Sequence, residues 1–119
     1  LHYVDAPSCI EAVRATLGRA SAVGLASEHL MFEVIECARI ADPAALGAAL
    51  SGRSGAWRLL LDDFGRGPSG LEILEKLRPD GVKLDRLLVD GAAENAASRA
   101  IVRKVVEIAR AHDFIVYAK

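Results

Sequence analysis

The chain has 119 residues, 52% of them hydrophobic and 26% charged, and its 15 basic and 16 acidic residues leave a formal net charge of −1. This length suits a single domain, and so balanced a charge gives no general attraction for nucleic acid or for an anionic membrane surface. Aromatic residues make up only 5%, which argues against base-stacking platforms, and no apolar run approaches the roughly 20 residues of a membrane-spanning helix. We therefore expect no DNA, RNA or membrane partner for this segment.

The first residue and the cysteines bear on the origin and the compartment of the chain. The sequence begins with Leu1 rather than Met, so either its start was processed or it is a fragment. Cys9 and Cys37 lie far apart, without the paired spacing of zinc or redox sites. Two thiols and no visible signal peptide fit a reducing compartment, and we expect a cytoplasmic protein whose cysteines are small buried hydrophobic residues.

Helices and strands are predicted to alternate along the whole chain. Helices are expected over 7–22, 44–50, 70–77 and 95–112, with Asp42 and Ser69 as candidate N-caps. Strands are expected over 30–35, 57–61, part of 82–89, and 114–117. Such alternation with short connections predicts an α/β fold, and continuous apolar strands favour a parallel sheet that is buried on both faces.

Charged side chains occur where the predicted strands end. They are Glu33 and Glu36, Asp62 and Asp63, and Lys83 and Asp85. Because the carboxyl ends of parallel strands converge, these groups are candidates for one site, and carboxylates from neighbouring strands suit Mg²⁺ or Mn²⁺. A lysine beside them could orient a phosphate or an attacking water. The alternative for such strand-end carboxylates is helix capping and loop hydrogen bonding.

A glycine-rich loop over 64–70 follows the acidic pair directly. It contains Gly65, Gly67 and Gly70, which permit a positive φ or close backbone approach. The loop matches neither GxxxxGK[ST] nor GxGxxG, so it is a weak phosphate-binding signal. We expect a shaped loop next to the carboxylates instead.

The motifs together resemble a known family. LDDFGRGPSG at 61–70, the KLD strand at 83–85 and FEVIE at 32–36 are similar, in this spacing, to the middle of an EAL domain. The collinear resemblance covers about residues 24–119. That family hydrolyses cyclic di-GMP to linear pGpG in bacterial second-messenger signalling.

The resemblance implies a role for each of the charged residues. It implies Mg²⁺ or Mn²⁺ ligands at Glu33, Asp62 and Asp63, a two-metal mechanism, and contact between Lys83 and the attacking water. Asp85 would support the Lys83 strand. Glu36 would anchor the glycine loop, with Gly65, Gly67 and Ser69, and couple the contacts of a homodimer to the metal site.

The departures from the family are equally specific. An EAL domain is a (β/α)₈ TIM-like barrel, a fold of about 250 residues, so this chain corresponds to about four βα units in the centre of an incomplete domain. The EAL tripeptide is absent, Ile35 replaces a usual threonine, and Lys119 stands where the family has a metal-binding glutamate. We therefore expect the chain by itself not to hydrolyse cyclic di-GMP.

Two alternatives remain at this point. One is a degenerate EAL domain that acts as a cyclic di-GMP receptor or a protein-interaction module. The other, more distant, is a receiver-like phosphoacceptor domain of similar length. Four barrel strands would leave two open edges and one uncovered layer of side chains, which residues beyond this segment are expected to complete.

Overall fold

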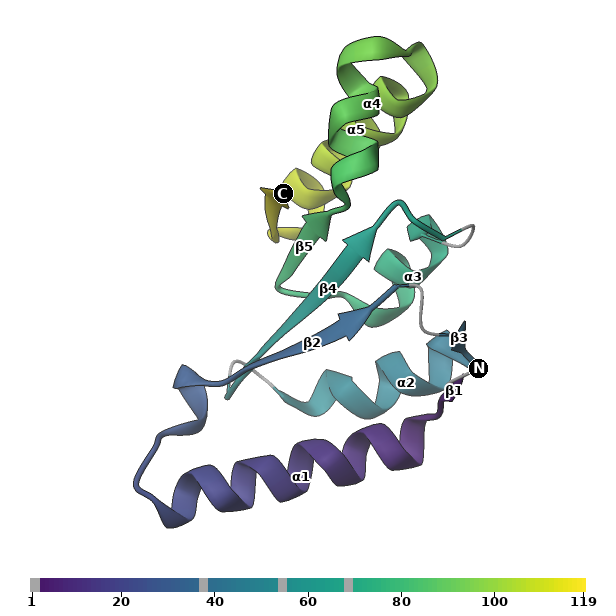
Figure 1. Ribbon diagram of the computed structural model, residues 1–119. Coiled ribbons are helices and arrows are strands. Elements are labelled where there is room, and N and C mark those ends of the chain that lie inside the picture. Colours follow the sequence, from purple (N-terminus) through teal and green to yellow (C-terminus); the bar gives the residue numbers. More distant parts are fainter. Residues whose placement is uncertain (1–2, 37–38, 54–55, 68–69) are drawn as a thin grey trace.

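A parallel sheet organises the structure. The computed structural model describes residues 3–36, 39–53, 56–67 and 70–119 (Figure 1). Among these residues, four strands lie in the order β2-β4-β5-β6, all parallel: β2 (Met31–Ile35), β4 (Arg58–Phe64), β5 (Gly81–Leu84) and β6 (Ile115–Ala118). Two short strands, β1 (Tyr3–Val4) and β3 (Arg39–Ile40), form a separate parallel pair that the sequence did not predict.

The helices connect successive strands. They are α1 (Ala6–Ala22), α2 (Pro43–Leu50), α3 (Gly70–Leu77), α4 (Arg86–Glu94) and α5 (Ala96–His112), with short 3₁₀ turns at Ser27–His29 and Ser51–Arg53. Side-chain caps set several of the starts. Asp5 accepts a hydrogen bond from the Ser8 N–H of α1, and Asp42 accepts one from the Ala45 N–H of α2, each at 2.9 Å. The predicted cap at Asp42 is therefore present, whereas Ser69 lies outside the described residues.

One face of the sheet carries the hydrophobic core. Leu59 and Leu61 of β4 and Val82 of β5 are almost fully buried. They belong to the same apolar cluster as Leu46 of α2 and Val105 of α5. Fully burying a side chain of this size stabilises the fold by roughly 1.5–3 kcal/mol, so this layer fixes the strands on which the charged side chains are carried.

The opposite face of the sheet is open. Side chains alternate along a strand, so the residues between those of the core point away from the helices. Met31, Ile35, Ile115 and Tyr117 lie on this open face and are 40–55% exposed. The sequence had favoured a sheet buried on both faces; the structure corrects this, because the helices cover only one face and leave the uncovered layer expected for part of a barrel.

The run 82–89, predicted to be partly strand, divides at Asp85. β5 ends at Leu84, and the Asp85 carboxylate accepts a hydrogen bond from the Leu87 N–H at 2.9 Å, which caps α4. In α4 only Leu88 is buried, while Leu87 is 75% exposed. The apolar run 87–89 therefore belongs to a helix that forms a hairpin with α5 at the far end of the molecule from α1 (Figure 1).

The strand order separates two of the fold alternatives. Each strand of the main sheet lies beside the next one in chain order, as in a βα barrel. Receiver-like domains have the order 2-1-3-4-5, in which the first strand lies inside the sheet. The observed order therefore does not support the receiver-like alternative. Within the described residues, no helix is long and apolar enough to cross a membrane.

Candidate functional site

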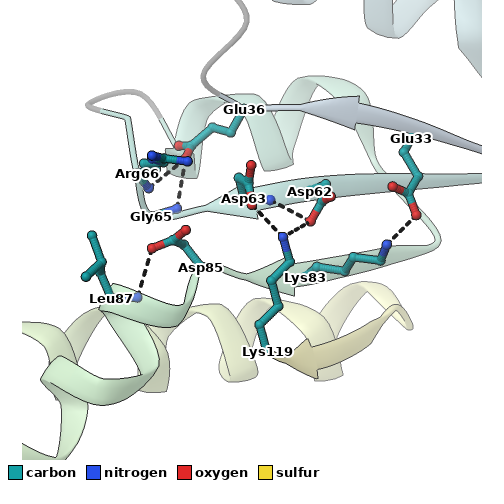
Figure 2. A network of polar contacts seen from close by, with 10 residues as sticks. All are labelled: Glu33, Glu36, Asp62, Asp63, Gly65, Arg66, Lys83, Asp85, Leu87 and Lys119. Atoms are coloured by element: carbon teal, nitrogen blue, oxygen red, sulfur yellow. Dashed lines mark hydrogen bonds and ion pairs between the residues drawn. The ribbon is translucent and has the colours of Figure 1, made fainter.

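Five charged side chains gather at the carboxyl edge of the open face. This charged cluster consists of Glu33 from β2, Asp62 and Asp63 from the end of β4, Lys83 from β5, and Lys119 directly after β6 (Figure 2). The register explains most of the arrangement. Ile35 lies opposite Asp62, Glu33 opposite Leu60, and Lys83 opposite Tyr117, so their side chains share one face.

A local irregularity brings the two aspartates to the same side. Consecutive residues of a regular strand point to opposite faces, but the pairing of β4 with β5 shifts between Leu61 and Phe64. Asp63 adopts a φ of 55°, in the left-handed region that non-glycine residues seldom occupy. The Asp63 N–H also donates to Asp62 Oδ1 at 2.8 Å. Both carboxylates consequently face the same cation.

That cation is the side chain of Lys119. Its Nζ lies 2.6 Å from Asp62 Oδ1 and 2.5 Å from Asp63 Oδ1 (Figure 2). Hydrogen bonds to these two carboxylates raise the pKa of the Lys119 ammonium group. Partial burial acts to raise the pKa of Asp62, but hydrogen bonds from Lys119 and the Asp63 backbone outweigh it, so the pKa of Asp62 lies below its usual value. The Lys119 ammonium group and the Asp62 carboxylate are therefore both charged at neutral pH.

Glu33 and Lys83 form the second ion pair of the cluster. Lys83 Nζ donates to Glu33 Oε1, and this hydrogen bond raises the pKa of the Lys83 ammonium group. Both side chains are partly exposed, at 27% for Lys83 and 41% for Glu33. Ile35, predicted as a departure near this site, lies on the same face and is 46% exposed.

Glu36 holds the glycine loop. Its Oε2 accepts three backbone N–H groups, from Gly65 at 2.8 Å and from Arg66 and Gly67 at 3.1 Å each. Glu36 is 5% exposed, and its Oε1 is buried and has no hydrogen-bond partner among the described residues. Gly65 has a φ of 99°, which only glycine adopts readily. The carboxylate thus fixes the path of the loop that follows the acidic pair (Figure 2).

The remaining predicted residues lie outside the charged cluster. Asp85 is buried and its carboxylate caps α4, which is a structural use of this group. Cys9 is half-buried, and this burial raises the pKa of its thiol. Ser69 and Cys37 fall outside the described residues.

Sequence reasoning had not singled out a pocket at the opposite, amino edge of the sheet. It has a volume of about 580 Å³ and includes Arg53 and Asp80 in its lining. Arg53 donates to Asp80 at 3.2 Å and to the carbonyl oxygens of Leu50 and Arg78 at 3.0 and 2.6 Å. Its guanidinium group thus joins the end of α2 to the loop between α3 and β5, and we assign this pocket no ligand.

The charged cluster, as arranged, does not fit a divalent cation. Mg²⁺ and Mn²⁺ require several oxygen ligands that converge on one point. Here Asp62 and Asp63 converge on an ammonium group instead, and Glu33 is paired with Lys83. No group of three or more His, Cys, Asp or Glu side chains in the described part of the chain could hold a metal ion.

Comparison with known proteins gives a consistent result. The model of the EAL domain family matches residues 4–119. An uncharacterized protein of Azorhizobium caulinodans is 37% identical over 107 residues, which are 89% of this chain and 14% of that protein. The probable cyclic di-GMP phosphodiesterase PdeA of Escherichia coli is 33% identical over 63 residues, which are 53% of this chain and 9% of that protein.

Comparison with solved structures gives a result that agrees with the family match. The manganese and cyclic di-GMP complex of Klebsiella pneumoniae BlrP1 matches with a TM-score of 0.77 and 29% identity, over 98% of this chain and 31% of that chain. A calcium and cyclic di-GMP complex of the same protein also matches. The chain therefore spans less than a third of each of these relatives.

Proposed function

Because the chain belongs to the EAL domain family, we propose that it acts in bacterial cyclic di-GMP signalling as the central part of a domain that binds this dinucleotide on its open face. Its fold is α/β, a portion of the TIM-like barrel of that family. The observation that carries the proposal is the charged cluster at the carboxyl edge of the strands, where the ligand sites of βα barrels lie. Relatives of this fold are described in complex with cyclic di-GMP.

The two lysines are the groups we propose to contact the ligand. Cyclic di-GMP is a dianion with two phosphodiester groups, and Lys83 and Lys119 place ammonium groups on the face where it would lie. Both ammonium groups also neutralise neighbouring carboxylates, which otherwise repel an anion. The glycine loop held by Glu36 would form one wall of the same site.

Residues 1–119 alone are proposed not to hydrolyse the dinucleotide. The family resemblance implies Mg²⁺ or Mn²⁺, but the carboxylates expected to bind such ions are paired with lysines. A second candidate function is hydrolysis by a longer protein whose other strands supply further ligands. The similarity to the probable phosphodiesterase PdeA favours that candidate.

Calorimetry combined with product analysis tests these proposals. Cyclic di-GMP is titrated into the protein with and without Mg²⁺, and the mixture is then analysed by chromatography for pGpG. We expect binding heat in both conditions, no pGpG, and weaker binding for Lys83→Ala. Lys104→Ala is the matched control, because Lys104 lies on α5 and pairs with Glu107 rather than with the cluster. No heat in either condition refutes the binding proposal. Formation of pGpG by residues 1–119 refutes the proposal that this segment alone does not hydrolyse the dinucleotide, whereas pGpG formed only by a longer protein supports the second candidate.

A homodimer and a cytoplasmic location complete the proposal. Leu71 and Ile101, both more than 40% exposed, line a pocket of about 330 Å³ beside Glu36 and the glycine loop. A second copy that covers this apolar surface would couple dimer contacts to the loop. Light scattering should give a dimer mass for the protein and a monomer mass for Ile101→Asp, with Glu94→Ala as a control on an exposed helix position. A monomeric mass for the unchanged protein contradicts this part.

A further inference from the structure

Lys119 occupies an unusual position for a lysine near the surface. Surface ion pairs generally join one cation to one anion and contribute little. Lys104 and Glu107 are an example, with a distance of 3.5 Å and side chains more than half exposed. Lys119 instead contacts two adjacent carboxylates at 2.5 and 2.6 Å, and those carboxylates are only 22% and 17% exposed.

The carboxylates are held in place for a shared cation. Asp63 keeps its side chain beside that of Asp62 only through the left-handed backbone and the shifted strand register. Two carboxylates so close repel each other unless a positive charge lies between them. Lys119 supplies that charge from directly after β6, which is separated from β4 by β5, at a sequence separation of 56 residues from Asp63.

We infer that the Lys119 ammonium group takes the place of a divalent cation between Asp62 and Asp63, so that the charged cluster is assembled without a metal ion. The three carboxylates and two ammonium groups of the cluster leave one net negative charge. A divalent cation would have to displace Lys119 or share its carboxylates against Coulomb repulsion. Metal independence is thus a property of this chain, and it is set by a single residue.

This inference concerns the same site as the proposed function, but its test involves no nucleotide. Binding of Mn²⁺ alone is measured by electron paramagnetic resonance in the natural full-length protein and in variants at position 119. Lys119→Ala removes the internal cation, Lys119→Glu also adds an oxygen ligand, and Lys119→Arg keeps the positive charge. Lys104→Ala serves as the control for loss of a lysine elsewhere.

We expect the Mn²⁺ affinity of this site to rise at least about tenfold in Lys119→Ala. The ammonium group repels a divalent cation bound at contact distance, and removing this repulsion should change the affinity by more than a factor of ten. Lys119→Glu should bind more tightly still, whereas Lys119→Arg and Lys104→Ala should match the unchanged protein. A further Asp62→Asn substitution should abolish the gain, which locates the ion. A thermal shift with Mn²⁺ should then appear in Lys119→Glu only when Asp62 is intact.

Two results would overturn the inference. One is Mn²⁺ binding by the unchanged protein that Asp62→Asn abolishes, because the site would then hold a metal beside Lys119. The other is a correctly folded Lys119→Glu variant, checked by circular dichroism, with no gain in Mn²⁺ affinity. If the position-119 variants fail to fold, the first comparison still decides, since it needs only the unchanged protein and Asp62→Asn. In every case the result is independent of whether cyclic di-GMP binds.

Discussion

The buried Glu36 carboxylate should control the stability of the glycine loop, and Glu36→Ala tests this. A net hydrogen bond to a charged group contributes roughly 1.5–3 kcal/mol, and Oε2 accepts three from Gly65, Arg66 and Gly67. The contributions do not add fully, because the three donors share one oxygen and the loop is partly exposed to water. Removing the carboxylate also removes the cost of burying Oε1, which no described residue contacts by a hydrogen bond. We therefore expect loop opening to become easier by about 2–3 kcal/mol.

Amide hydrogen exchange measures this local opening directly. Since about 1.4 kcal/mol corresponds to a factor of ten, exchange of the 65–67 amides should accelerate roughly 30- to 150-fold in Glu36→Ala. Glu36→Gln keeps an oxygen acceptor and should show a smaller acceleration. Glu72→Ala, at an exposed position in α3, should leave these amides unchanged. Equal exchange in Glu36→Ala and Glu72→Ala would refute the reasoning, as would a larger effect for Glu36→Gln than for Glu36→Ala.

Three further predictions concern stability. Leu61→Ala should lower the free energy of unfolding by about 2–5 kcal/mol, because this side chain is fully buried, whereas Leu87→Ala at an exposed position should change urea denaturation little. Gly47→Ala should destabilise by about 1–3 kcal/mol, because a backbone carbonyl of α3 lies where its methyl group would be; Gly18→Ala in α1 meets no neighbour and should be stabilising in the same assay. Because the pKa of Asp62 is lowered by folding, its contribution to stability is present above about pH 4 and is lost as pH falls through the lower native pKa. Asp62→Asn should remove that part of the acid dependence in a pH series of unfolding curves, and an unchanged series would contradict it.

Sequence patterns predicted the alternation of helices and strands because apolar runs and helix caps are local signals. Asp85 was correctly placed at a strand end, but the helix α4 that follows was not predicted, because the apolar residues 87–89 also fit a strand and only the capping hydrogen bond distinguishes the two. The uncovered sheet face follows from which residues lie outside the helix layer, and the strand pattern alone does not contain that information. The family resemblance supplied what periodicity could not, namely the barrel and the relation among the charged residues.

The candidate site, like the fold, could be predicted from the sequence only in part. Strand-end positions predicted that carboxylates would converge, and the resemblance indicated that Lys119 would add a positive charge there. The contact of one ammonium group with both aspartates was not predictable from alternation, which assigns Asp62 and Asp63 to opposite faces. It depends on the backbone at Asp63 and on the register between β4 and β5. The roles of Glu33, Asp62, Asp63 and Lys83 in binding remain predictions.

At position 63, the residue that best fits the left-handed backbone differs from the residue that the charged cluster requires. Glycine at this position would relieve the backbone cost of roughly 1 kcal/mol, but it would delete one of the two carboxylates that hold Lys119. Selection for thermal resistance alone would therefore move position 63 toward glycine, whereas the proposed ligand site requires aspartate there. The residue found there in any variant population thus reports which of the two pressures was stronger.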